Sequence, residues 1–157
     1  MDPERAANPS EPRWGYSEPV EVTFRDLDLA GHVNNAVVFS WMETVRLHYY
    51  MEASGIEDPM QIDFILAESA ARYFVPVRYQ HKIVAEIVPT RVGKTSWELV
   101  YRFVDRPTGT VLMRARSVQV SYDYQTRQKK PLPDRVRSRF LRDLVSAESE
   151  GWPASPK

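Results

Sequence analysis

Residues 35–53 form the stretch that most constrains the fold, because they are compatible with one long helix that is apolar on nearly every side. The apolar residues are Ala36, Val37, Val38, Phe39, Trp41, Met42, Val45, Leu47, Tyr49 and Tyr50. They leave no broad polar face, and a helix of this kind is buried on most sides. We therefore expect a sheet to curl around the helix, or a partner subunit to cover what the sheet leaves exposed.

Both ends of this helix carry residues with strong positional preferences. Asn34 precedes the helix, and its side-chain oxygen can accept a hydrogen bond from a free N–H group of the first turn. Gly55 follows Ser54, and glycine readily adopts the left-handed conformation that ends many helices. The sequence therefore predicts one helix from about Asn35 to Ala53.

Alternating apolar and polar residues predict strands on both sides of the helix. Strands are expected over residues 20–25, 62–75 with an interruption near 68–72, 81–92, 97–104 and 110–124. In the first of them, Val20, Val22 and Phe24 would form the buried face. Pro89 indicates an edge position or a bulge. Strands in series after one helix favour an α+β fold over a wound parallel sheet.

The chain length of 157 residues fits a single domain. We expect the folded unit to span residues 18–147, with a disordered tail over 1–17 and a flexible tail over 148–157. A second, amphipathic helix is predicted over residues 133–147. Its apolar side would consist of Val136, Phe140, Leu141 and Leu144.

The composition excludes several classes of function. The 21 basic and 21 acidic residues balance, which argues against a nucleic-acid-binding protein. The chain has no cysteine, so disulfides, thiolate nucleophiles and cysteine-bound zinc are excluded. The N-terminus has no apolar core for a signal peptide, and no run approaches the ~18 apolar residues that span a bilayer. We expect a cytoplasmic protein that does not associate with membranes.

A polar turn directly before the long helix concentrates the residues that could carry chemistry. It contains Asp26, Asp28, His32, Asn34 and Asn35. If the preceding strand continues to this point, both aspartates face the same interior, where two carboxylates would repel each other. Only one of them is then expected to enter a site, and the pattern alone does not say which. A metal site is an alternative use of these side chains, but we expect none.

Other sequence motifs are incomplete. Gly93, Lys94 and Thr95 match the end of a phosphate-binding loop, but Val88 stands where the first glycine is required. The chain has no Gly-x-Ser-x-Gly segment for a serine hydrolase.

The segments Phe24-Arg-Asp-Leu-Asp28, Gly31-His-Val-Asn-Asn35 and Trp41-Met-Glu43, followed by Arg46, resemble a known family. They are similar to the hotdog-fold acyl-CoA thioesterases of the 4-hydroxybenzoyl-CoA thioesterase type. Plant acyl-ACP thioesterases share a similar pattern. The resemblance covers about residues 18–125 and implies a long helix wrapped by an antiparallel sheet of about five strands. It also implies a homodimer with joined sheets and interfacial active sites, often assembled into a homotetramer.

The resemblance assigns catalytic roles to the polar turn. Asp28 corresponds to the catalytic carboxylate, which either attacks the thioester or acts as a general base on water. A backbone N–H near Asn35 would polarise the thioester carbonyl. His32 would orient the substrate or the Asp28 carboxylate, and Asp26 would be structural. Each residue also has a purely structural alternative. For Asp28, this alternative is to cap the turn without taking part in catalysis.

Three further groups complete the expected site. Glu43 is a second candidate catalytic carboxylate, because some related thioesterases use a helix glutamate, and Arg46 could pair with it. Asn34 is expected to cap the helix and is a candidate substrate contact. Arg91 and Lys94 are candidates for binding the phosphates of coenzyme A. The resemblance implies no metal or redox cofactor, with coenzyme A present only as part of the substrate.

The sequence thus predicts hydrolysis of an acyl-CoA thioester and leaves three alternatives open. The basic cluster around Arg91 is thin, which leaves room for a thioester of an acyl carrier protein. The same fold could support an enoyl-thioester hydratase, or a non-catalytic module that binds acyl thioesters. Trp41, Phe64, Tyr73 and Phe74 are candidates for lining an acyl pocket.

Overall fold

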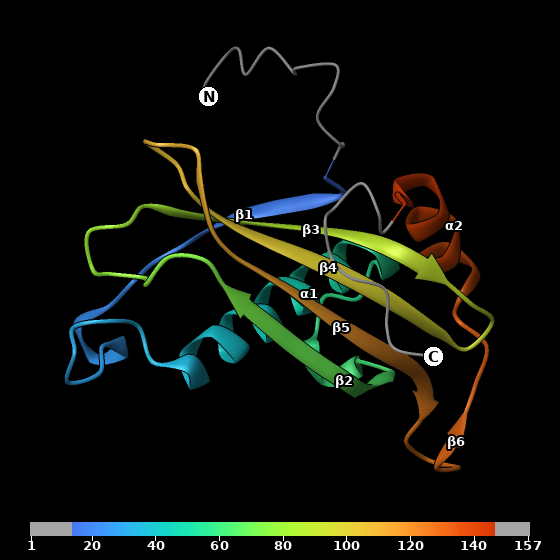
Figure 1. Cartoon of the computed structure of the whole chain (residues 1–157). Coiled ribbons are helices and arrows are strands. Elements are labelled where there is room, and N and C mark those ends of the chain that lie inside the picture. The colour runs from blue at the N-terminus through green and yellow to red at the C-terminus, as the bar shows by residue number, and fades with distance from the viewer. Residues whose placement is uncertain (1–13, 147–157) are drawn as a thin grey trace.

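The computed structural model describes residues 14–146 and consists of one antiparallel sheet curled around a long helix (Figure 1). The strands are β1 (Tyr16–Val20), β2 (Phe64–Tyr73), β3 (Ile83–Val92), β4 (Ser96–Asp105), β5 (Thr110–Asp123) and β6 (Gln128–Lys129). Their order in the sheet is β1-β3-β4-β5-β2, with the short β6 paired to β5. The helices are α1 (Asn35–Ser54) and α2 (Asp134–Asp143). The predicted α+β arrangement is therefore confirmed.

The limits of α1 agree with the prediction from the sequence. The Asn34 side chain accepts a hydrogen bond from the Ala36 N–H at 2.9 Å. Gly55 ends the helix with a φ of 77° and donates its N–H to the Met51 carbonyl at 2.8 Å. Because a side chain at this φ would be strained, glycine suits the position.

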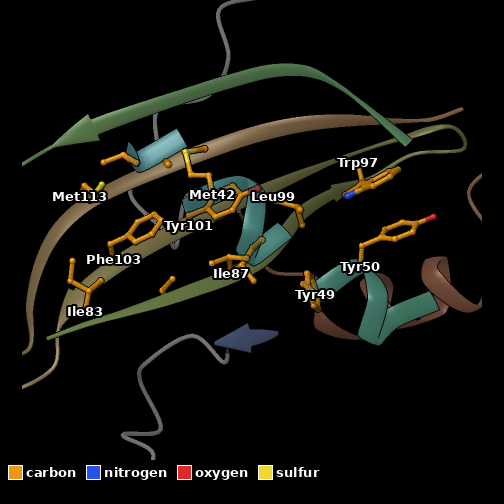
Figure 2. Close-up of a cluster of buried hydrophobic side chains, with 14 of the residues drawn as sticks. Met42, Tyr49, Tyr50, Ile83, Ile87, Trp97, Leu99, Tyr101, Phe103 and Met113 are labelled. Atoms are coloured by element: carbon orange, nitrogen blue, oxygen red, sulfur yellow. The ribbon is translucent and has the colours of Figure 1, made fainter. Parts of the chain in front are cut away.

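One face of α1 supplies much of the hydrophobic core (Figure 2). Met42 and Tyr49 are buried there against side chains of β3, β4 and β5, among them Ile87 and Phe103. Next to Tyr49, the ring of Tyr50 stacks on the ring of Trp97, with centroids 5.7 Å apart. Burying side chains of this size contributes about 1.5–3 kcal/mol each, so α1 and the sheet stabilise one another.

The described part of one chain does not cover the opposite face of α1, so the sheet alone does not bury the helix on most sides, and the predicted cover by a partner subunit stays a prediction. Phe39 is 40% exposed, and Ser40, Glu43 and Thr44 on the same face are also exposed. The curled sheet reaches around only one side of the helix (Figure 1).

The strand predicted over residues 20–25 is wrong. β1 ends at Val20, and Phe24–Asp26 form a short 3₁₀ helix in which Phe24 is 84% exposed. The Asp26 carboxylate accepts the Thr23 N–H at 2.7 Å, and the Asp26 N–H donates to the Thr23 carbonyl at 3.1 Å. These local bonds compete with strand pairing. The argument that Asp26 and Asp28 share one face therefore does not apply.

Two other expected features differ from the structure. β2 pairs with β5 without the interruption predicted near residues 68–72, apart from a bulge between Leu66 and Glu68. In α2, Val136 and Phe140 are buried as predicted, but Leu141 is 46% exposed and Leu144 lies beyond the helix end.

The folded region begins earlier in the chain than predicted. β1 begins at Tyr16, inside the range assigned to a tail, whereas residues 1–13 and 147–157 lie outside the described part. The prediction of an edge position or a bulge at Pro89 is confirmed. A bulge in the pairing of β3 with β4 directly follows Pro89, and Pro89 lies beyond the part of β3 that pairs with β1. Among residues 14–146, no helix is long and apolar enough to cross a membrane.

A buried polar cluster lies between α1 and the sheet. The Arg46 guanidinium donates to the Tyr101 hydroxyl at 3.3 Å, and that hydroxyl is 2.6 Å from the Ser117 hydroxyl. Gln119 also donates to Ser117, and all four side chains are buried. Burial raises the pKa of Tyr101, so its hydroxyl stays protonated and available to both neighbours.

Removing the Tyr101 hydroxyl should destabilise the fold, because Arg46 would lose this buried partner. We expect Tyr101→Phe to lower the free energy of unfolding by about 1–3 kcal/mol in urea titrations followed by circular dichroism. Tyr79→Phe is the matched control, since Tyr79 is 53% exposed. Equal stability of the two variants would contradict a structural role for the cluster.

Candidate active site

The chain between the short 3₁₀ helix and α1 forms a tight hairpin. Leu27 and Val33 make an antiparallel bridge, and the Asp28 N–H donates to the His32 carbonyl at 2.7 Å. Gly31 has a φ of 74°, which permits the sharp reversal between them. The Val33 N–H donates to the Val77 carbonyl at 2.8 Å, so the hairpin is fixed to the segment that follows β2.

The hairpin orients the Asp28 carboxylate. One oxygen, Oδ1, accepts the Ala30 N–H at 2.8 Å and the His32 N–H at 3.1 Å. The other oxygen, Oδ2, receives no hydrogen bond from the described residues. Asp28 therefore caps the turn, which is the structural role considered as an alternative to catalysis. Its second oxygen is still without a hydrogen-bond donor among the described residues.

The first turn of α1 provides a hydrogen-bond donor beside this carboxylate. Asn34 accepts the Ala36 N–H on its side chain and the Val37 N–H on its backbone carbonyl. Among residues 14–146, the Asn35 N–H donates to no other group. A free N–H at a helix N-terminus carries partial positive charge and favours a negative ligand atom.

Asp28 and Asn35 line the same pocket, with a volume of about 270 Å³. His32, Val33 and Val38 complete the side formed by the hairpin and α1. The facing side consists of residues 73–77, from the end of β2 and the segment beyond it. The pocket thus combines a carboxylate and a helix N-terminus with apolar walls, an arrangement suited to a polar reacting group on an apolar ligand.

The sequence identified part of the apolar wall. Tyr73 and Phe74 line the pocket as predicted. Trp41 and Phe64 do not: the Trp41 ring packs against Phe103 at 6.2 Å, and the Phe64 ring packs against Tyr50 at 4.7 Å. Sequence reasoning missed Val38 and residues 75–77, because no motif marks a wall that forms only when β2 ends beside α1.

The remaining residues of the polar turn have different positions. The Asp26 carboxylate binds the Thr23 N–H, and the Asp26 carbonyl accepts the Asn34 N–H at 2.8 Å, so Asp26 braces the turn outside the pocket. His32 lines the pocket, and its backbone N–H rather than its ring contacts Asp28.

Glu43 is exposed and does not line the pocket of its own chain. The predicted pair between Glu43 and Arg46 is wrong, since Arg46 is buried and directed toward Tyr101. The helical spacing permits a contact between residues three apart, but here the sheet buries Arg46 and leaves Glu43 exposed.

Arg91 and Lys94 lie at the far end of the molecule from this pocket. Both belong to the region of the β3–β4 turn, which is at the opposite end of the sheet from the N-terminus of α1 (Figure 1). The 20 residues of α1 span about 30 Å. Within one chain, these two side chains therefore do not reach the pocket.

Among the described residues, no three His, Asp or Glu side chains form a metal-binding group.

The fold assigns the chain to a known superfamily. A family model for the thioesterase-like superfamily matches residues 22–140, so the chain belongs to this superfamily and has its hotdog fold. It is 26% identical to a thioesterase of Thermus thermophilus solved in complex with coenzyme A and Zn. That match covers 89% of this chain and 97% of the other, with a TM-score of 0.72.

Two further relatives support the assignment to the fold. A predicted thioesterase from Bacillus stearothermophilus is 20% identical, with a TM-score of 0.76 over 83% of this chain and 97% of that one. An uncharacterised Bacillus subtilis protein, YsmA, is 25% identical over 88 residues. This alignment covers 56% of the chain and only 60% of the length of YsmA. Thioester hydrolysis is the general activity that the family supports.

Replacing Asn34 tests its role as a helix cap. We expect Asn34→Ala to lower the free energy of unfolding by about 0.5–2 kcal/mol, because the Ala36 N–H loses its acceptor. Asn34→Asp should retain most of the stability, since aspartate also caps helices well. Thermal unfolding of the two variants measures the difference, and equal losses would show that capping is not the contribution of Asn34.

Proposed function

We propose that this protein hydrolyses an acyl-CoA thioester, with Asp28 as the catalytic carboxylate and the Asn35 N–H as the group that polarises the carbonyl. One observation carries the proposal: Asp28 and Asn35 line the same pocket, and among the described residues the Asp28 Oδ2 accepts no hydrogen bond and the Asn35 N–H donates none. Thioester hydrolysis needs both an oxygen nucleophile and a donor for the developing oxyanion.

The chemistry assigns one task to each group. The thioester carbonyl accepts the Asn35 N–H, and charge that develops on its oxygen is stabilised by the positive end of α1. Asp28 either removes a proton from water that attacks the carbonyl carbon, or attacks that carbon itself and forms an anhydride that water then cleaves. The carbon–sulfur bond breaks, and the thiol of coenzyme A leaves with a proton. The two backbone bonds to Oδ1 keep the carboxylate oriented.

Asp28→Asn tests the role of the carboxylate with little change in shape. The amide oxygen can still accept the Ala30 and His32 N–H groups, so the hairpin should fold normally. We expect turnover of acyl-CoA, followed by release of free thiol, to fall by about two to four orders of magnitude. Glu43→Gln is the comparison, and a larger loss there would transfer the catalytic role to Glu43. A parental rate in Asp28→Asn would refute the assignment.

The same assay separates the alternative functions. An enoyl-thioester hydratase would consume the enoyl absorbance of crotonyl-CoA without releasing thiol. A binding module would bind acyl-CoA without turnover. A carrier-protein thioesterase would act on the acyl carrier protein and leave the matching acyl-CoA intact. A panel of aliphatic and aryl acyl groups would then define the acyl specificity.

A second copy of the chain would complete the site. Among the described residues, β2 pairs only with β5, so it is an edge strand, and it has exposed apolar residues that include Ile65 and Leu66. We propose that two β2 strands pair antiparallel around a two-fold axis. Such an axis reverses the partner's sheet, so the partner's β3–β4 turn, with its Arg91 and Lys94, moves to the end of the molecule that holds the pocket. In this arrangement they are candidates for binding the substrate's phosphates.

Disrupting this edge should separate the copies and lower activity together. Leu66 is 48% exposed on β2, and we expect Leu66→Lys to shift the mass measured by light scattering from a dimer toward the 18.2 kDa monomer. Thiol release should fall in parallel, because each site would lack the partner's residues. Leu141→Lys is the matched control, since Leu141 has similar exposure on α2. A wild-type monomer with full activity would exclude the proposal.

A further inference from the structure

A buried cation lies between α1 and the sheet without a counterion from the described residues. Arg46 is 6% exposed, and its guanidinium makes one hydrogen bond, to the Tyr101 hydroxyl at 3.3 Å. Among residues 14–146 it forms no ion pair. The buried carboxylates of the described chain are engaged elsewhere, since Glu86 pairs with Arg102 and Asp105 accepts hydrogen bonds around the β4–β5 turn.

A buried guanidinium of this kind needs an acceptor of opposite charge. An arginine side chain keeps its charge in a protein, and it has five N–H donors. Burying a charge is unfavourable unless the charge is paired, and one neutral hydroxyl does not pair it. The nitrogens of Arg46 are not among the fully enclosed, unpaired atoms of the described residues, so the free donors remain accessible to a ligand.

The neighbouring side chains can add donors to this group, which we call the Arg46 cluster and which consists of Arg46, Tyr101, Ser117 and Gln119. The Gln119 amide donates to the Ser117 hydroxyl, and its buried oxygen accepts no hydrogen bond from the described residues. Half a turn of this amide lets Ser117 donate to that oxygen, while Tyr101 donates to Ser117 and Arg46 donates to Tyr101. Each hydroxyl then has a donor and an acceptor, and two N–H groups of Gln119 are left for a ligand. A positive charge with several donors suits a carboxylate.

The Arg46 cluster and the active-site pocket lie along one stripe of α1. Val38 lines the pocket, and Met42 and Arg46 follow it at spacings of four residues, which places the three side chains one above the other. The eight residues from Val38 to Arg46 span about 12 Å. Because helical side chains lean toward the N-terminus, Arg46 leans toward the pocket.

Strand β2 connects the same two places. Tyr73 lines the pocket, and Ser69 is in register with Ser117 of the Arg46 cluster. Ala71 packs against the core, so Ser69, Ala71 and Tyr73 share the inner face of the strand. The four residues from Ser69 to Tyr73 span about 13 Å, which agrees with the distance along α1. Ser69 and Ala71 are small and half-buried, so an acyl chain can lie against them.

We infer that the Arg46 cluster binds a carboxylate at the far end of the acyl chain, so that the preferred substrate is a thioester of a medium-length dicarboxylic acid. This inference rests on the proposed function. With the thioester carbonyl at the Asn35 N–H, the chain lies over Ala71 and Ser69, and its terminal carboxylate accepts hydrogen bonds from Arg46 and Gln119. The ligand thus supplies the negative charge that Arg46 lacks in the described chain. Hydrolysis releases the free dicarboxylic acid and coenzyme A.

Two acyl-CoA substrates of equal chain length test the inference. We expect the wild type to have a higher kcat/KM for the substrate that ends in a carboxylate than for the one that ends in a methyl group. Arg46→Met removes the charge at similar length, and we expect it to lower the ratio of the two kcat/KM values by about tenfold or more. Arg142→Met is the matched control, since the Arg142 side chain is 69% exposed on α2, and it should leave the ratio unchanged. A wild type that prefers the methyl-ended chain, or an unchanged ratio in Arg46→Met, would overturn the inference.

Binding of octanedioate provides a second test that does not depend on hydrolysis. We expect calorimetric titrations to show binding by the wild type, and Arg46→Met to weaken it by about tenfold or more. Gln119→Glu keeps the arginine and places a carboxylate inside the Arg46 cluster, where it competes with the ligand. This variant should weaken octanedioate binding to a similar degree while its melting temperature stays the same or rises, so it remains informative if Arg46→Met does not fold. No binding by the wild type, or wild-type affinity in Gln119→Glu, would contradict the inference.

Two outcomes separate this inference from the proposed function and from dimer formation. If the wild type hydrolyses no acyl-CoA, the proposed function fails, whereas the octanedioate titration still decides whether the Arg46 cluster binds a carboxylate. If light scattering shows that Arg46→Met converts a dimer into monomers, the missing partner of Arg46 is a group of the second copy, and the inference is overturned.

Discussion

Burial of one face of α1 in the curled sheet is the interaction on which the rest of the structure depends. The helix brings Met42 and Tyr49 against strands that are distant in the sequence. Each large side chain contributes about 1.5–3 kcal/mol through burial. Because the packing fixes the axis of α1 relative to the end of β2, it also fixes where the first helical N–H groups point.

The geometry of the candidate active site depends on how α1 begins. Asn34 joins two structures, since its N–H binds the Asp26 carbonyl and its side chain caps the helix. Capping satisfies Ala36 and Val37 but leaves the Asn35 N–H without a partner in the described chain. A group that is an energetic cost in an isolated helix thereby becomes available to a substrate oxyanion. The Asp28 carboxylate is similar, because Oδ1 accepts two backbone N–H groups of the turn and Oδ2 has no hydrogen-bond donor among the described residues.

Local residue preferences predicted the limits of α1 accurately. The limits of α1 followed from Asn34 and Gly55, whose preferences depend on adjacent backbone groups. Alternation failed at Phe24, because Thr23 and Asp26 close a 3₁₀ turn that hydrophobic periodicity does not register. The expected pair of Glu43 and Arg46 failed for another reason: helical spacing permits the contact, but the sheet buries Arg46 beside Tyr101.

The sequence alone determined the class of fold, the helix with its limits and the turn that contains Asp28, because each is encoded by contiguous residues and their periodicity. The tertiary structure decided which groups meet. It placed Tyr73 to Val77 opposite Asp28, left Glu43 exposed, separated Arg91 and Lys94 from the active site of their own chain, and buried Arg46 beside Tyr101. These outcomes depend on how the sheet curls and where strands end, and contacts between distant segments leave no pattern in the local sequence.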